Sequence, residues 1–96
     1  MEKHMDIKDR VANEIIKEQE LIIGPLAWRE AGKVSGLRLD VTAHLAYIDG
    51  DVKAVLEALV GRYERLFGQL SLDVCRDAIR PLIAKIPEDQ LPVALR

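Results

Sequence analysis

Apolar residues recur at helical spacing near the start of the chain, between Asp6 and Ile23. They keep the three- and four-residue intervals that place side chains on one face of a helix, and they are Ile7, Val11, Ile15, Ile16 and Ile22. The opposite face is predicted to be solvated and carries Lys8, Asp9, Glu14, Lys17, Glu18 and Glu20. Gly24-Pro25 ends this helix, because proline lacks a backbone donor but suits the first turn of a new helix. A second, short helix is therefore predicted from Pro25 to about Ser35.

Two further helices are predicted in the second half of the chain. The stretch "VKAVLEALVGRYERLFG", residues 52–68, has helical apolar spacing, an aspartate cap before it and a closing Gly68. The stretch "SLDVCRDAIRPLIAKI", residues 71–86, has the same spacing, with Pro81 expected to kink it. The 96 residues suit a single domain. We expect a frayed N-terminus at residues 1–5 and an extended C-terminal tail at residues 87–96.

The stretch "LRLDVTAHLAYI", residues 37–48, fits two patterns. Its odd positions are apolar, which is typical of a strand, but Val41, Leu45 and Ile48 also form a helical stripe behind a capping Asp40. A lone strand would expose unpaired edges and would need another subunit to pair with. The prediction is therefore an all-α fold, a compact bundle of four main helices with a fifth short helix at 41–48. An intersubunit strand at 37–48 stays open as the alternative.

Composition and charge exclude several classes of function. The 14 basic and 16 acidic residues are interspersed and give a net charge of −2, which disfavours nucleic acid as a partner. Cys75 is the only cysteine, so no intrachain disulfide can form, which fits a cytoplasmic protein. No apolar run is long enough for a membrane span, so no membrane association is expected. The apolar content of 49% leaves enough apolar surface for an oligomer.

Three candidate chemical sites have simpler structural explanations. Gly24 and Gly32-Lys33 imitate a phosphate-binding loop, but seven residues separate them where that loop needs four. Helix capping explains the three aspartates that could suggest a cation site, which are Asp40, Asp49 and Asp51. Cys75 lies on an apolar stripe and could be activated by His44 only if the fold brought the two together. The chain is therefore predicted to be no enzyme, with no catalytic residue, cofactor or metal.

The segment "IIGPLAWREA", with the closest match over Leu21 to Ala31, resembles small helical domains attached to bacterial signalling proteins. In those domains an apolar helix runs into Gly-Pro-[Leu/Ile]-Ala and then into a short helix, and further helices follow, as "VLEALVGRYERLFG" does here. The resemblance implies an interaction or regulatory module and not an enzyme. This chain differs in standing without a receiver or kinase domain.

We therefore expect a non-catalytic protein–protein interaction module of a cytosolic regulatory or signalling system. It would act through apolar helix faces on another protein or as a homodimer, using Leu26, Trp28, Tyr47 and Tyr63. Whether Trp28 belongs to the core or to the interface stays open. The alternative is a small-ligand sensor with an apolar pocket between helices, in which the polar end of the ligand is held by Arg29, His44 and Arg62.

Overall fold

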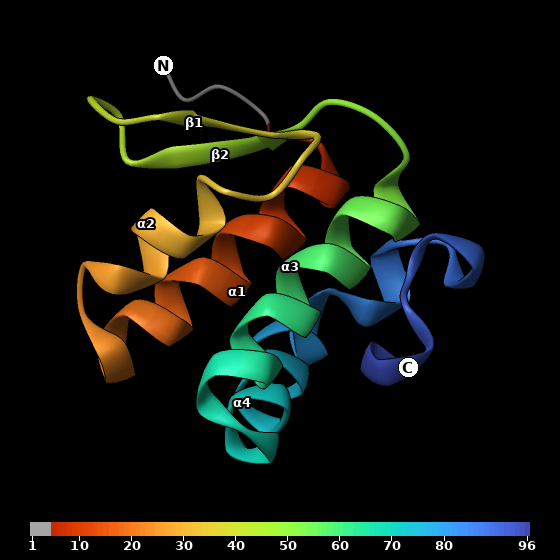
Figure 1. Cartoon of the computed structure of the whole chain (residues 1–96). Coiled ribbons are helices and arrows are strands. Elements are labelled where there is room, and N and C mark those ends of the chain that lie inside the picture. The colour runs from red at the N-terminus through yellow and green to blue at the C-terminus, as the bar shows by residue number, and fades with distance from the viewer. Residues whose placement is uncertain (1–4) are drawn as a thin grey trace.

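The computed structural model describes residues 5–96, which form four α-helices and one β-hairpin (Figure 1). The predicted fraying of residues 1–5 falls almost entirely outside this range. The order is α1 (Ile7–Ile23), α2 (Leu26–Ala31), β1 (Leu37–Asp40), β2 (Leu45–Ile48), α3 (Val52–Phe67) and α4 (Gln69–Ile79). Three short 3-10 segments follow, η1 (Arg80–Lys85), η2 (Glu88–Gln90) and η3 (Val93–Leu95).

The prediction of an all-α fold is wrong, because residues 37–48 form a hairpin and the fifth helix at 41–48 does not exist. β1 and β2 pair antiparallel, with Leu37 opposite Ile48 and Leu39 opposite Ala46. The chain reverses over residues 41–44, where the backbone N–H of Ala43 donates to the Asp40 carboxylate at 3.0 Å. The reversal changes which positions face inward, from odd numbers in β1 to even numbers in β2. The continuous odd-numbered alternation in the sequence therefore concealed two strands.

The helices follow the predicted apolar spacing, and their ends lie close to the glycine and proline signals. α1 ends before Gly24 and α3 ends before Gly68, both of which have positive φ angles. The last helix is shorter than predicted, because α4 ends at Ile79 and the chain tightens into η1, which has Pro81 at its start. The tail at 87–96 is also not extended: η2 and η3 fold it back, and Leu91, Pro92 and Leu95 are buried.

The core lies where α1 packs against α2, α3 and α4. Tyr63 of α3 is fully buried there, and its hydroxyl donates to the Ala27 carbonyl of α2 at 2.6 Å. Gln19 of α1 is also fully buried and donates from Nε2 to the Ser71 carbonyl of α4 at 3.0 Å. These two hydrogen bonds connect the helices that carry the hairpin. No helix within residues 5–96 has the combined length and apolar character needed to cross a bilayer.

The hairpin lies across one end of the helices (Figure 1), and two buried side chains of α1 attach it there. Asn13 accepts from the Ala46 N–H at 2.9 Å and donates to the Ala46 carbonyl at 2.8 Å. Asp9, one helical turn earlier, accepts from the Ile48 N–H at 2.7 Å. The backbone groups on the outer edge of β2 are thus paired with α1 side chains, as a further strand would pair with them. Asp9 was expected on the solvated face, and its burial corrects that expectation.

Candidate interaction surface

β1 forms the other edge of the sheet, and its backbone groups at Leu39 point away from β2. The Asp49 N–H donates to the Gly36 carbonyl at 2.7 Å, which fixes the alternation of bonded and non-bonded pairs along the hairpin. Leu39 and Ala46 form a non-bonded pair, so both turn their N–H and C=O outward. Ala46 meets Asn13 there. Leu39 has no hydrogen-bond partner for either group within residues 5–96.

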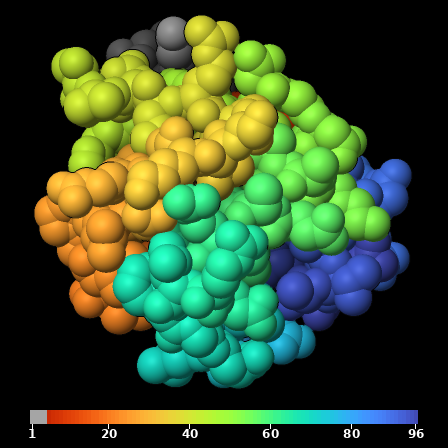
Figure 2. Space-filling model, in the orientation of Figure 1, coloured from red at the N-terminus to blue at the C-terminus, as the bar shows by residue number. Residues whose placement is uncertain are grey.

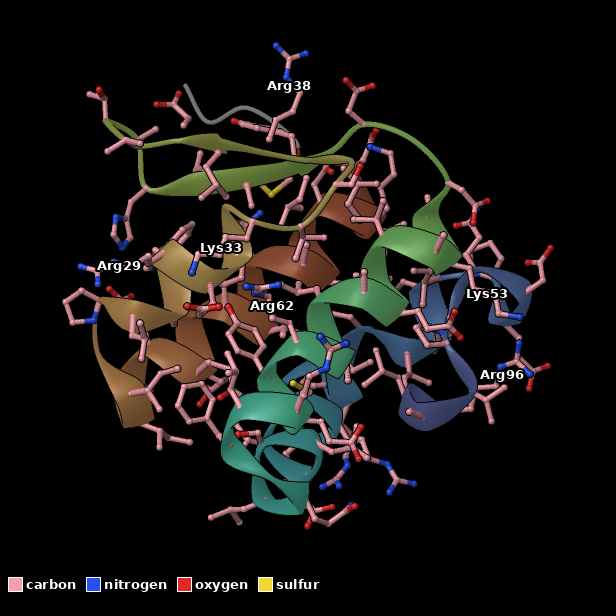
Figure 3. The ribbon with its side chains drawn as sticks, viewed as in Figure 1. Arg29, Lys33, Arg38, Lys53, Arg62 and Arg96 are labelled. Carbon is pink, nitrogen blue, oxygen red and sulfur yellow. The ribbon has the colours of Figure 1, made fainter. Side chains whose placement is uncertain are left out.

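The side chains along β1 alternate between the body and solvent. Leu37 is buried and Leu39 half-buried, whereas Arg38 and Asp40 are exposed on the outer face. Tyr47 of β2 lies opposite Arg38 and is 39% exposed. Figure 3 shows Arg38 extending away from the helices. In Figure 2 the segment around β1 is yellow, and part of it lies on the visible surface.

We call this surface the β1 edge. It comprises the outward backbone groups of Leu37 and Leu39 and the side chains of Arg38, Leu39, Asp40, Val41 and Tyr47. Four of these side chains, all but that of Val41, line a shallow hollow of about 260 Å³. Val41 follows the strand and is 85% exposed, the largest exposed fraction of any bulky apolar residue within 5–96. The β1 edge therefore combines unpaired backbone, apolar surface and two opposite charges.

Gly36 holds the entry to the hairpin close against α3. Its φ of 84° lies in the left-handed region that side chains rarely adopt. A Cβ atom at this position would lie 2.7 Å from Cγ2 of Val55, which is too close for two carbon atoms. Gly36 therefore lets β1 begin directly beside α3, and it accepts the first hydrogen bond of the ladder from Asp49.

The predicted interface residues are placed in different parts of the molecule. Tyr47 lies on the β1 edge, whereas Leu26 and Trp28 are half-buried on α2. Tyr63 is fully buried, so its side chain cannot contact a partner. Trp28 packs against the core, and its ring centroid lies 4.2 Å from that of His44. The indole Nε1 of Trp28 is buried and makes no hydrogen bond within residues 5–96 that meets the usual distance and angle limits.

The predicted ligand-binding residues do not meet in one pocket. His44 Nε2 lies 3.1 Å from Glu20 Oε2, whereas Arg62 donates from Nε to Glu30 Oε1 at 2.7 Å. Arg29 is exposed on α2, and Figure 3 shows it well apart from Arg62 in that view. Two of the three side chains, His44 and Arg62, are therefore engaged with separate carboxylates. This arrangement does not favour the ligand-sensor hypothesis.

Those carboxylates have lowered pKa values because of their neighbours. The pKa of Glu20 lies below its ordinary value of 4.5, chiefly through the nearby Trp28 indole and then through His44. The pKa of Glu30 is lowered by the hydrogen bond from Arg62 and then by that from Lys33. Each of these interactions favours the ionised form of the carboxylate. The hydrogen bond from Arg62 to Glu30 also joins α3 to α2.

Cys75 is fully buried on α4, and its Sγ lies 3.4 Å from Nε2 of Gln19. Burial raises the pKa of the thiol to about 11, which keeps it protonated near neutral pH. His44 is engaged elsewhere, so the predicted alternative of a Cys–His pair has no geometric support. Within residues 5–96, no three His, Cys, Asp or Glu side chains are grouped closely enough to hold a metal ion.

A larger cavity of about 400 Å³ lies along α4 and the C-terminal segments. Its lining carries both signs of charge, with an ion pair between Asp77 and Arg80, and consists of Asp73, Arg76, Asp77, Arg80, Ile83, Leu95 and Arg96. Because both acidic and basic side chains line it, this cavity gives no clear preference for a ligand of one charge.

Comparison with known proteins leaves the geometry as the guide to function. No family model, no curated protein and no solved structure matches this chain. The resemblance at the Gly-Pro-Leu-Ala segment therefore stays a prediction. The β1 edge was not predicted from the sequence, and its one visible signal was the strand-like alternation over residues 37–48.

Proposed function

We propose that this protein is a non-catalytic module that binds another polypeptide by accepting its strand at the β1 edge. One observation carries the proposal: the two edges of the sheet differ. The outer edge of β2 is closed by Asp9 and Asn13, whereas the described chain leaves the outward N–H and C=O of Leu39 uncovered. An exposed strand edge is a template for a further strand, and many peptide-binding domains use one.

The chemistry of the β1 edge suits this role. The backbone of Leu39 would supply directional hydrogen bonds, and Val41 and Tyr47 would supply apolar contact area. Arg38 and Asp40 would select among partner strands by charge. Several large apolar residues are also exposed near helix ends, namely Leu21, Ile22, Leu66 and Leu70. The proposal places the contact on the hairpin because only there do exposed apolar side chains lie beside an unpaired strand edge of the described chain.

The non-catalytic part of the proposal is supported by the state of the reactive groups. The Cys75 thiol is buried and protonated, and His44 is engaged by Glu20. The Gly-Pro-Leu-Ala motif supports placing the module in a cytosolic regulatory system.

The experiment selects short random peptides, displayed on phage, for binding to the immobilised protein, and measures the selected peptides by fluorescence polarisation. Leu39→Pro removes the outward N–H, and proline is tolerated on an edge strand whose N–H faces solvent. Leu39→Ala is the matched control, because it shortens the same side chain but keeps the donor. Binding that is lost in Leu39→Pro and retained in Leu39→Ala supports the proposal. Equal binding by both variants and the wild type overturns it.

A further inference from the structure

We propose that the strand bound at the β1 edge is β1 of a second copy of this chain. This inference rests on the proposed function and names its partner. The two strands would run antiparallel about a twofold axis at Leu39, giving one sheet in the order β2–β1–β1–β2. Such a contact is isologous, since each copy offers the same surface to the other.

The outward backbone groups determine which registers can form. Outward-facing residues recur at every second position of β1, so Leu37 and Leu39 are the positions of the strand available for pairing. With the axis at Leu39, the two Leu39 residues exchange both of their hydrogen bonds. The Leu37 residue then lies opposite Val41 of the second copy, where that chain has already entered its turn. The Leu37 N–H already donates to the Val34 carbonyl at 3.2 Å, so the intermolecular ladder ends there.

The charges on the outer face select this register over its neighbours. With the axis at Leu39, Arg38 lies directly opposite Asp40 of the second copy, and the pair occurs twice. Moving the register by two residues in one direction places Arg38 of one copy opposite Arg38 of the other. Moving it by two residues in the other direction places Asp40 of one copy opposite Asp40 of the other. Opposite charges across neighbouring strands stabilise a sheet, and like charges in that position destabilise it. The sequence Arg38-Leu39-Asp40 is therefore complementary to itself in one antiparallel register.

The rest of the outer face is compatible with this pairing. The ion pair between Arg38 and Asp49 spans 3.6 Å between two exposed side chains, so exchanging it for an intermolecular pair costs little. Tyr47 lies beside Arg38 and Leu45 lies beside Asp40 within each hairpin. One row across the dimer would then read Tyr47, Arg38, Asp40, Leu45, with the charged pair between two larger side chains. A strand of four residues forms a small contact, so the dimer should be weak and dependent on concentration.

The test is a charge exchange between subunits, read by sedimentation equilibrium over about a hundredfold range of concentration. Arg38→Glu places two acidic pairs across the axis, and Asp40→Lys places two basic pairs there. Each variant alone should dimerise at least about tenfold more weakly than the wild type. An equimolar mixture of the two should associate to within about threefold of the wild type, because each new charge then meets its opposite.

Two controls separate this pairing from effects on folding. Asp49→Asn removes the internal partner of Arg38 without changing the strand, so its self-association should equal that of the wild type. Asp40 also accepts from the Ala43 N–H in the turn, so Asp40→Lys alters the hairpin as well as the charge. The double variant Arg38→Glu with Asp40→Lys carries the same turn defect, yet it should dimerise because its charges are again complementary.

The pairing of β1 with β1 is overturned if neither single variant weakens self-association. It is also overturned if the mixture of the two variants fails to restore the association. A wild type that stays monomeric over the whole range overturns it as well. These results are distinguishable from failure of the proposed function, which is read from Leu39→Pro and peptide binding. If peptides bind the wild type but not Leu39→Pro while no dimer forms, the β1 edge binds strands of other proteins and the self-pairing is wrong.

Discussion

Replacing Asn13 with alanine should loosen the hairpin from α1 and lower the stability of the whole domain. Asn13 is 3% exposed, and its amide group pairs with both the N–H and the C=O of Ala46, which is fully buried. The truncation leaves both of these backbone groups without a partner. A buried polar group that loses its partner costs about 1–3 kcal/mol, and a water entering the vacated space would recover part of this. We therefore expect a loss of about 2–4 kcal/mol in the free energy of unfolding.

The assay is urea unfolding followed by circular dichroism, with two variants beside Asn13→Ala. Glu14→Ala changes the neighbouring half-buried residue, which makes no side-chain hydrogen bond within residues 5–96, and should lie within about 0.5 kcal/mol of the wild type. Asn13→Asp keeps the acceptor for the Ala46 N–H but places a carboxylate against the Ala46 carbonyl. It should be strongly destabilised at neutral pH and less so in acid, where a protonated carboxyl can donate.

The refuting result is an Asn13→Ala protein within about 0.5 kcal/mol of the wild type. It would mean that the Asn13 amide does not stabilise the outer edge of β2. The contrast between the two edges, on which the proposed function rests, would then depend on Asp9 alone.

Three further predictions concern the glycines, a carboxylate and the thiol. Gly36→Ala should destabilise the fold by about 1–3 kcal/mol, because Gly36 has a positive φ and a Cβ there would collide with Val55 of α3. Gly61 lies within α3 with open space around it, so Gly61→Ala should stabilise the fold by about 0.5–1 kcal/mol. Thermal unfolding of both variants beside the wild type measures the two effects. Because Arg62 lowers the pKa of Glu30 below 4.5, the ionised carboxylate stabilises the fold above that pH, and this stability is lost as the pH falls through the lower folded value. Glu30→Gln should therefore reduce the difference in unfolding free energy between about pH 7 and about pH 3, measured with urea. Cys75 should react slowly with an aromatic disulfide reagent at neutral pH and rapidly in denaturant, since burial raises its pKa to about 11; a fast reaction of the native protein would contradict its burial.

The polar residues of α1 show what the periodic pattern missed. Asp9 was assigned to the solvated face because it is charged, and Asn13 received no role. Both are buried, and Gln19 is as well. The two amides lie among the apolar residues of the buried face, and an amide in such a position indicates a buried hydrogen-bonding partner. The identity of that partner could not be predicted, because it lies 33 residues away for Asn13 and 52 for Gln19.

The hairpin shows a different kind of failure. Its strand-like alternation was noticed, but pairing was assigned to another subunit because no second strand was recognised. The turn at 41–44 lacks glycine, and His44 takes up a positive φ of 58° where glycine or asparagine is more common. Without that turn signal, residues 37–48 read as one element. The candidate site was missed for the same reason, and of the predicted interface residues only Tyr47 lies on it.

The sequence by itself determined the helices of this protein, because helical spacing and helix ends depend on neighbours a few residues apart. Helical spacing, Gly24-Pro25, Gly68 and Pro81 were sufficient to predict the four helices and to place most of their ends near the observed positions. The tertiary structure decided which strand edge is closed and which is open. That choice depends on Asp9 and Asn13 meeting backbone groups far along the chain, a contact that exists only once α1 and the hairpin have packed together.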